Sequence, residues 1–383
     1  MATWCILCAS YPLQPYRRAR VKQLLSVLFL ASFVTAPMAA EEAVINVYNW
    51  SDYIADEVIT DFEKESGIKV VYDVYDSNEV LEAKLLAGRS GYDLVFPTAR
   101  PFAGRHIKAG VYQKLDKNKL ANISNLSPSI MKGLSDIDPG NAHAVPYMWG
   151  TTSLGINPDK VANLLGSDVP SDTWALIFDP KYAAKLAACG ISLMDDTTEV
   201  ISAALIYLGK DVNSTSKADL DAATAMLAAV RPYIRYFHSS QYVNDLANGD
   251  LCVAHAYSGD VLQARDRADE AKNGVKVALT IPREGAIAFV DVMVIPADAK
   301  HSENAHRLID YLMRPEVIAK ISNYVGYANA IPASKPLLDE AVRNNSGIFP
   351  SDEVLARLVA PAELDPASQR ARTRAWTRVK AGQ

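Results

Sequence analysis

The chain has 383 residues, of which 49% are hydrophobic and 22% charged, and its formal net charge is −5. This composition excludes a disordered, collagen-like or multi-spanning membrane protein, and the length predicts two domains because one core rarely exceeds roughly 250–300 residues. Residues 1–40 carry four basic side chains and no acid, so the remainder holds 35 basic and 44 acidic residues, a net charge of −9. Such acidity disfavours nucleic acid as a partner and favours a small cation.

The N-terminal segment has the order of a secretory signal peptide. A cluster of four basic residues that ends at Lys22 is followed by an apolar run of 11 residues, Leu24–Val34, and then by small residues up to Ala40. The run is too short to span a bilayer, which takes about 20 apolar residues. A buried N-terminal helix is the alternative, but the polar flanks disfavour it. We therefore expect residues 1–40 to be removed near Ala39 or Ala40, leaving an exported chain that does not insert into the membrane.

Cysteine usage agrees with export. Cys5 and Cys8 lie in the segment expected to be removed, which leaves Cys189 and Cys252. Two thiols in an oxidising compartment tend to pair, whereas two separate buried thiols are the alternative.

The first elements alternate between strand and helix. A helix with Ile54, Val58 and Phe62 on one face is expected to start near Ser51/Asp52 and to end at Gly67. A second helix is expected from a cap at Asp76, through Leu81 and Leu85, to Gly88. The strands are predicted at Val44–Asn49, Lys69–Tyr75 and Tyr92–Phe96. This β-α-β-α-β order predicts a parallel sheet, in which ligands bind beyond the carboxyl ends of the strands, here at residues 49–53 and 97–100.

The second half repeats this strategy. Two strands are predicted at residues 144–147 and 152–156, on either side of a break at Trp149-Gly150. Further strands are predicted at residues 190–194, 251–256, 275–281 and 288–295. Helices are predicted near residues 173–187, at 200–208, from a cap at 258–260 to about 271, and over most of the C-terminal third. The whole predicts an α/β protein of two lobes, each of about 120–190 residues.

No enzyme motif is present in the sequence. The six histidines show no H-E-x-x-H spacing, and there is no G-x-S-x-G, Walker or G-x-G-x-x-G pattern. We therefore predict no catalytic residue, no metal site and no cofactor. The enzyme alternative is a nucleophilic Cys189 or Cys252 near His255.

Acidic residues in unusual places carry the functional argument. Asp291 lies in an otherwise apolar strand, where an unpaired carboxylate costs several kcal/mol, so it either pairs with an Arg or Lys or anchors a ligand. Asp52 and Asp260 each precede a helix and have an N-cap as the alternative role. Glu199 has the alternative role of complementing a helix dipole.

Aromatic residues accompany these acids. Trp50, Tyr53, Tyr257 and Phe289 each lie within three residues of one of them. Aromatic faces attract cations by about 0.5–2 kcal/mol and carboxylates supply the opposite charge, so this grouping predicts a site for a small polycation with an apolar stem. A metal ion would favour oxygen ligands without the aromatic walls.

Several segments together resemble one family. They are Asn49–Tyr53 (NWSDY), Phe62–Lys69 (FEKESGIK), Asp76–Glu79 (DSNE), Tyr92–Val95 (YDLV), Pro146–Trp149 (PYMW), Tyr236–Tyr242 (YFHSSQY), Asn244–Gly249 (NDLANG) and Arg372–Val379 (RTRAWTRV). With these segments the chain, from about Val44 to its C-terminus, resembles the periplasmic polyamine-binding proteins of bacterial ABC importers, especially the putrescine-binding branch.

The resemblance implies a type II periplasmic-binding fold with two lobes, two crossovers that form a hinge, and a ligand cleft between the lobes. It places lobe 1 at residues 42–146 plus 269–341 and lobe 2 at 149–266 plus 344–383. It also implies a monomer in the periplasm that catalyses no reaction and delivers a polyamine to the membrane subunits of an ABC permease, and a disulfide between Cys189 and Cys252.

The ligand contacts that the resemblance implies are Trp50, Ser51, Asp52, Tyr53, Thr98, Glu199, Tyr257, Asp260, Phe289, Asp291 and Tyr327. In this interpretation Asp260 and Asp291 hold amino groups, and Ser51 and Tyr327 orient the ligand. The methylene chain is expected between the rings of Trp50, Tyr257 and Phe289.

Some positions depart from the putrescine-binding pattern. Thr98 and Tyr257 stand where Ser and Trp are usual, and Asp196 adds a carboxylate near Glu199, as in spermidine-preferring relatives. Arg100 would oppose a long cation unless it pairs with an acid. These changes leave open which polyamine is bound, and they raise the alternative of another cationic or amphoteric solute. His255 is either a structural residue or one that tunes the site with pH.

Overall fold

The computed structural model describes residues 41–166 and 168–382. The predicted signal peptide, its cleavage site, Cys5 and Cys8 therefore lie outside the described residues. Within the described part of the chain, no helix is long and apolar enough to cross a bilayer.

The first three strands confirm the predicted β-α-β-α-β unit. β1 (Val44–Trp50) pairs in parallel with β2 (Lys69–Tyr75) on one side and with β3 (Leu94–Val95) on the other. The connections contain α1 (Asp56–Ser66) and α2 (Asn78–Leu86). We refer to β1, β2 and β3 as the first strand group.

The helix starts in this unit differ from the prediction. α1 begins after Ala55, so neither Ser51 nor Asp52 caps it, and Gly67 ends it with a left-handed φ of 71°. The N-cap of α2 is Ser77 and not Asp76, because Ser77 has extended backbone and its hydroxyl oxygen accepts from the Val80 N–H at 3.3 Å. Asp76 is thereby left free of a structural role in the helix.

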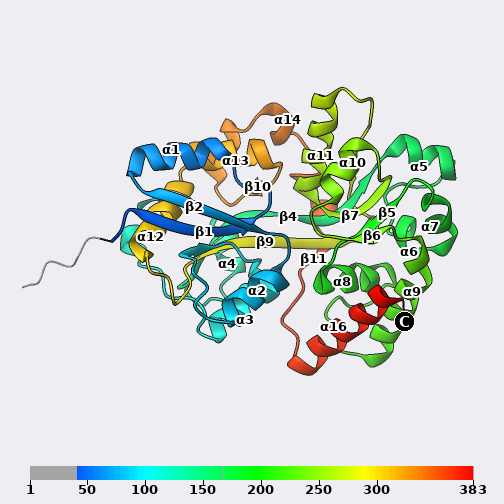
Figure 1. The fold of residues 1–383 in the computed structure, drawn as a ribbon, viewed down its shortest axis with the longest axis horizontal. Coiled ribbons are helices and arrows are strands. Elements are labelled where there is room, and N and C mark those ends of the chain that lie inside the picture. The colour runs from blue at the N-terminus through cyan, green and yellow to red at the C-terminus, as the bar shows by residue number, and fades with distance from the viewer. Residues whose placement is uncertain (1–40, 167, 383) are drawn as a thin grey trace, which may run out of the picture. The chain divides into compact units, whose positions relative to one another are not determined.

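Two long antiparallel strands occupy the middle of the sheet (Figure 1). β4 (Ala144–Ile156) is one continuous strand of 13 residues, so the predicted break at Trp149-Gly150 is wrong. A register shift between Pro146 and Trp149 against β9 (Ala286–Val294) absorbs the irregularity that the sequence shows there. Gly150 permits close packing, because a Cβ there would lie 2.8 Å from the Tyr327 ring and 2.9 Å from the Ser258 hydroxyl.

The strands beyond β4 form a second strand group of β7 (Val253–Tyr257), β5 (Ile191–Leu193) and β6 (Tyr236–Phe237). The order through the sheet is β2-β1-β3-β9-β4-β7-β5-β6, so β9 and β4 join the two groups. Three short strands pair at the side of this path: β8 (Ala278–Thr280), β10 (Ala328–Asn329) and β11 (Leu358–Val359).

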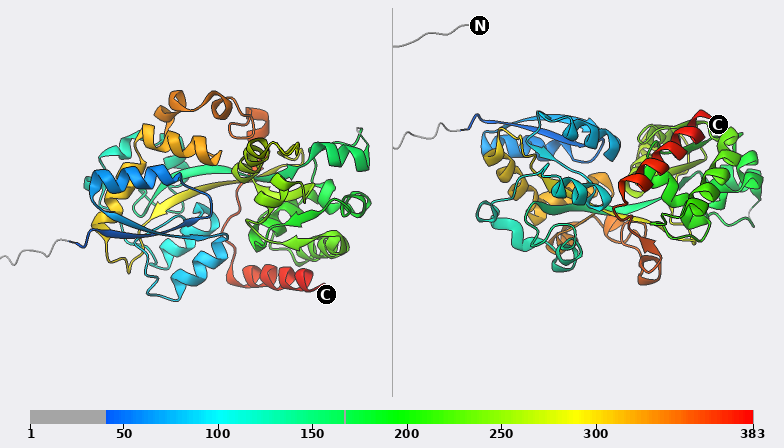
Figure 2. Two further views of the ribbon diagram at one scale, coloured as in Figure 1. Left: turned by 45° about the horizontal axis from the view of Figure 1, so that its top comes forward. Right: turned by 90° about the horizontal axis from the view of Figure 1, so that it is seen from below.

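Helices cover both strand groups (Figures 1 and 2). In the middle of the chain they are α3 (Gly104–Lys108), α4 (Pro128–Gly133), α5 (Pro158–Leu165), α6 (Ala175–Phe178), α7 (Pro180–Leu186), α8 (Thr197–Tyr207), α9 (Lys217–Val230), α10 (Tyr242–Asn248) and α11 (Ser258–Ala271). The C-terminal part contains α12 (Ser302–Leu312), α13 (Pro315–Val325), α14 (Glu340–Arg343), α15 (Asp352–Leu355) and α16 (Pro366–Ala381). α12 packs on β1, whereas α16 returns to α8 and α9 beside the second strand group.

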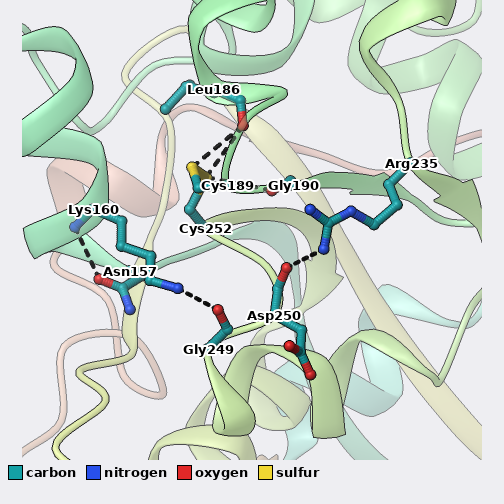
Figure 3. Close-up of a disulfide and its surroundings, with 9 residues drawn as sticks. All are labelled: Asn157, Lys160, Leu186, Cys189, Gly190, Arg235, Gly249, Asp250 and Cys252. Atoms are coloured by element: carbon teal, nitrogen blue, oxygen red, sulfur yellow. Dashed lines mark hydrogen bonds between the residues drawn. A yellow bond between two sulfur atoms is a disulfide. The ribbon is translucent and has the colours of Figure 1, made fainter.

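A disulfide joins Cys189 to Cys252, as expected, with the two Cα atoms 5.5 Å apart (Figure 3). It connects the end of the α7 segment to the start of β7. The Cys252 N–H donates to the Gly190 carbonyl at 3.0 Å, and the Asn157 N–H donates to the Cys252 carbonyl at 2.8 Å. Because both sulfur atoms are in this bond, neither cysteine is a free nucleophile, which removes the basis of the enzyme alternative.

Candidate ligand-binding cleft

A cleft lies between the end of β1, the start of α11 and the middle of β9. It contains every site residue that the sequence predicted except Glu199. Its lining residues are Trp50, Ser51, Asp52, Tyr53, Tyr75, Asp76, Thr98, Ser239, Ser240, Val243, Tyr257, Asp260, Phe289, Asp291 and Tyr327.

Asp291 is held by two hydroxyl groups and not by a cation. It lies on β9 and is only 2% exposed, and its carboxylate accepts from the hydroxyls of Tyr53 and Thr98, each at 2.7 Å. Thr98 faces it through an isolated antiparallel bridge. Burial raises the pKa of Asp291 to about 7, against the lowering effect of these two hydrogen bonds. A carboxylate so buried and so weakly compensated favours an incoming cation.

Asp260 has a matching arrangement on the other side of the fold. It is the third residue of α11, whose N-cap is Tyr257, so the N-cap alternative for Asp260 is wrong. Its two oxygens accept from the hydroxyls of Tyr242 at 2.6 Å and Tyr327 at 2.8 Å. Burial raises its pKa to about 6.

Aromatic rings form a continuous wall between these acids. Trp50 meets Tyr257 edge to face with centroids 5.8 Å apart, and Tyr257 meets Phe289 at 5.5 Å. Phe289 in turn lies 6.1 Å from Tyr327. The Trp50 indole is oriented by a hydrogen bond from Nε1 to the Phe96 carbonyl at 2.8 Å. The rings can pack against the methylene chain of a ligand, and their faces attract its ammonium groups.

The rim of the cleft carries two contacts between elements of the two strand groups. Asp52 has a left-handed φ of 54°, and its carboxylate lies 3.2 Å from Arg267 Nη2 of α11. His238 Nδ1 lies 3.9 Å from the carboxylate of Asp76. The Ser51 hydroxyl donates to the Tyr75 carbonyl at 3.3 Å. The first two of these contacts connect the first strand group to α11 and to the segment after β6 at the rim.

Glu199 does not line the cleft but belongs to a buried cluster with Asp196 and Glu79, which we call the acid trio. Asp196 is the N-cap of α8 and accepts from the Glu199 N–H at 2.9 Å, which confirms that these two acids are neighbours. Burial, followed by the charge of Asp196, raises the pKa of Glu199 to about 8. The hydroxyl of Tyr257, which is 9% exposed, is also buried without a hydrogen-bond partner, and the charges of all three acids help raise its pKa. The trio therefore lies next to the aromatic wall.

Arg100 is neutralised by an acid. Its guanidinium forms a salt bridge with Asp136 and donates to the Gly133 carbonyl at 2.8 Å. Arg100 is absent from the cleft lining, so the structure removes the electrostatic objection that the sequence raised.

His255 is a structural residue. Both ring nitrogens are buried without a hydrogen-bond partner, and the ring packs edge to face on Trp174 with centroids 5.3 Å apart. Burial lowers its pKa to about 3, so the imidazole is neutral and does not tune the cleft near neutral pH.

Some cleft residues were missed by the sequence reasoning. Tyr242 supports Asp260, and Ser239, Ser240 and Val243 line the cleft from the same segment. The conspicuous Tyr236–Tyr242 segment was a signal for this region. Glu79 was missed because it was interpreted only as part of a helix cap.

The arrangement defines a solute-binding protein, and comparison with known proteins shows the family. Residues 57–350 match the family described as bacterial extracellular solute-binding protein, and the chain belongs to that family. It has the two-lobed type II periplasmic-binding fold and is not an enzyme.

Individual relatives match along most of their length. The chain is 54% identical over 346 residues to the putrescine-binding periplasmic protein PotF of Escherichia coli, covering 90% of this chain and 93% of PotF. It is 51% identical over 361 residues to the putrescine-binding periplasmic protein SpuD of Pseudomonas aeruginosa, covering 94% and 98%. The crystal structure of the spermidine/putrescine ABC transporter substrate-binding protein PotD from Streptococcus pneumoniae is similar with a TM-score of 0.70 and 25% identity, covering 88% and 99%.

Proposed function

We propose that the protein captures a polyamine in the periplasm and delivers it to an ABC permease. The carrying observation is the pair of carboxylates of half-buried Asp260 and buried Asp291, which have tyrosine and threonine hydroxyls as partners and aromatic rings between them. The relatives PotF and SpuD, which are named as putrescine-binding periplasmic proteins, support the class of ligand and the compartment.

In this function the ligand's ammonium groups bind at Asp260 and Asp291. Burial raises the pKa values of both carboxyls when no cation is present. An ammonium group favours the ionised form of each carboxylate and donates charge-assisted hydrogen bonds to it, so the penalty of burial is offset only when a cation is bound. The hydroxyls of Tyr53, Thr98 and Tyr327 fix the direction in which the carboxylate oxygens point.

The acid trio supports a ligand with a third amino group, of the spermidine class. Two carboxylates match the two charges of a diamine, whereas Glu79, Asp196 and Glu199 provide further negative charge beyond Tyr257. Glu199 keeps its predicted role as a ligand contact in this proposal, although it contributes to the site from behind the aromatic wall.

An amphoteric solute is less well supported. A ligand carboxylate needs a cationic partner, but the residues that line the cleft in the described part of the chain include no lysine or arginine. Arg100, which motivated that alternative, is paired with Asp136.

We further propose the lobe boundaries at residues 42–146 plus 269–341 and 149–266 plus 344–383, a monomer, and export by the signal peptide in residues 1–40. The sheet supports the lobes, because β9 and β4 join two separate strand groups. The packing of α16 on α8 and α9 supports the return of the C-terminal segment to lobe 2.

The proposed function is tested with protein unfolded, freed of ligand and refolded. Thermal shift and calorimetry are measured against putrescine, cadaverine, spermidine, spermine and agmatine. We expect stabilisation by at least one amine, with spermidine binding at least as tightly as putrescine. If none of the five amines stabilises the protein, the function is wrong.

A further inference from the structure

Glu79 is a partly exposed residue whose two carboxylate oxygens are buried next to another acid. It lies on α2, next to the first strand group, whereas Asp196 and Glu199 lie at the start of α8, next to the second. Both carboxylate oxygens of Glu79 and the Oδ2 atom of Asp196 are buried without a hydrogen-bond partner. Among the described residues, neither side chain takes part in a salt bridge. The two carboxyls thus meet across the two halves of the fold with nothing to neutralise them.

Two adjacent buried carboxyls do not both ionise. Burial and then the charge of Asp196 raise the pKa of Glu79 well above its usual value. Burial also raises the pKa of Asp196, but the Glu199 N–H, which donates to Asp196 Oδ1 at 2.9 Å at the positive end of α8, acts against this rise. One proton on Glu79, donated to Asp196 Oδ2, would give a partner to that atom and to one of the two Glu79 oxygens.

The other titratable groups around Glu79 and Asp196 supply no positive charge that would let both carboxyls ionise. Glu199, whose pKa is raised to about 8, supplies no positive charge, and Asp195, whose negative charge acts on Asp196, is already paired with Lys380 at 2.6 Å. On the α2 side, Glu82 is paired with Arg105, and Asp76 lies at the rim beside His238. Tyr257 is the remaining group, and it is a neutral donor.

We propose that Glu79 is a specificity-determining residue that carries a proton shared with Asp196 when a diamine is bound and loses it to solvent when an ammonium group of a longer amine takes its place. The inference rests on the proposed function. Diamines and longer amines then differ in the number of protons that the protein takes up on binding. Closure on a diamine converts the Glu79 carboxylate and one proton into a carboxylic acid. Closure on a triamine leaves Glu79 ionised beside the third ammonium group.

Calorimetry of the full mature chain in two buffers of different ionisation enthalpy counts the protons. At about pH 7.5 we expect putrescine binding to take up between about one and two protons, because Glu199 can also protonate, and spermidine binding to take up about one fewer. The affinity for putrescine should fall by up to about tenfold per pH unit for each proton taken up, whereas the affinity for spermidine should depend less on pH.

The Glu79→Gln variant isolates the residue. A glutamine amide donates to Asp196 without an added proton, so proton uptake with putrescine should drop by about one while binding is retained, and the affinity for spermidine should fall at least about tenfold. Glu57→Gln is the matched control, because it removes one carboxylate from an exposed site on α1, and it should behave as the unaltered protein.

The outcomes separate the two proposals. Putrescine binding without proton uptake, or equal proton counts for E79Q and E57Q, overturns the role of Glu79 while leaving amine capture intact. Failure of every amine to bind overturns the proposed function itself. If E79Q does not fold, the proton counts of the unaltered protein with putrescine and spermidine decide the question.

Discussion

The hydroxyl of Tyr327 donates to the carboxylate of Asp260 over 2.8 Å, although 67 residues separate them. The contact depends on Gly259, because a Cβ at that position would lie 2.1 Å from Cε2 of the Tyr327 ring. Gly326, which ends α13 with a φ of 72°, directs the chain toward this position. Because Gly259 has no side chain, the Tyr327 ring can lie close enough for its hydroxyl to reach Asp260.

Gly259→Ala should displace Tyr327 from Asp260 and weaken amine binding at least about tenfold, since the buried carboxylate then loses one of its two donors. Calorimetry measures the change. Gly133→Ala is the matched control, because nothing lies within 4 Å of a Cβ there and the backbone φ is ordinary for a side chain. Equal affinities for the two variants would contradict this role of Gly259.

Asp291→Asn should weaken amine binding by at least about tenfold, because the amide replaces the negative charge that attracts the ammonium group. The ligand-free fold should be retained, since burial of the neutral amide avoids the desolvation penalty of the carboxylate. Titration calorimetry and urea unfolding check the two parts. Normal binding by this variant would show that Asp291 is structural.

The ligand-free protein should lose stability as pH rises from about 5 to about 8. Asp260, Asp291 and Glu199 have folded-state pKa values raised to about 6, 7 and 8, so over this range the folded protein binds more protons than the unfolded chain. Their stabilising contribution is complete below the unfolded pKa values and is lost as pH passes the raised ones. Two kinds of group act in the opposite direction. Carboxyls with lowered pKa values, such as Glu82 at about 2, act below this range, and His255, whose pKa burial lowers to about 3, offsets part of the loss up to about pH 7.

Urea midpoints at several pH values test this slope. The double variant Asp260→Asn and Asp291→Asn should be less sensitive to pH, because two of the carboxyls with raised pKa values no longer titrate. A saturating amine should also flatten the slope, because ammonium groups stabilise the ionised carboxylates. A ligand-free protein that gains stability between about pH 5 and 8 would contradict the assignment.

Asp136→Asn should weaken the binding of cations by freeing the guanidinium of Arg100, which lies two residues after Thr98 in the chain. The loss should be larger for spermidine than for putrescine, because Coulomb repulsion grows with ligand charge. Arg100→Ala combined with Asp136→Asn should restore binding, which a purely structural effect of Asp136 would not do. Comparing affinities at low and high salt provides the check, since screening reduces the effect.

Much of the fold could be predicted from the sequence because it depends on local periodicity. The strand Lys69–Tyr75 has the predicted boundaries, and Gly67 ends α1 as expected. The continuity of β4 could not be predicted. Trp149-Gly150 signals a break locally, whereas pairing with β9 on both sides of a register shift preserves the strand.

The site was predictable where an acid stood in an apolar context. Asp291 is such a case, and its odd position in a strand was sufficient to single it out. Its partners Tyr53 and Thr98 lie 238 and 193 residues away, and no local pattern places their hydroxyls on its oxygens. Glu79 was missed for a similar reason, since only the meeting of α2 with α8 makes it unusual.

The pairing of β4 with β9 also constrains how the lobes move. β4 and β9 are hydrogen-bonded to each other through the middle of the sheet, so they form a single ribbon. Such a ribbon bends more readily than its two strands slide along each other, because sliding would break the backbone hydrogen bonds between them. A slip of one residue would also turn every side chain of the moved strand to the opposite face of the sheet. Opening is thereby restricted to flexing about one axis, and each closure returns Tyr327 of one lobe to Asp260 of the other in the same alignment.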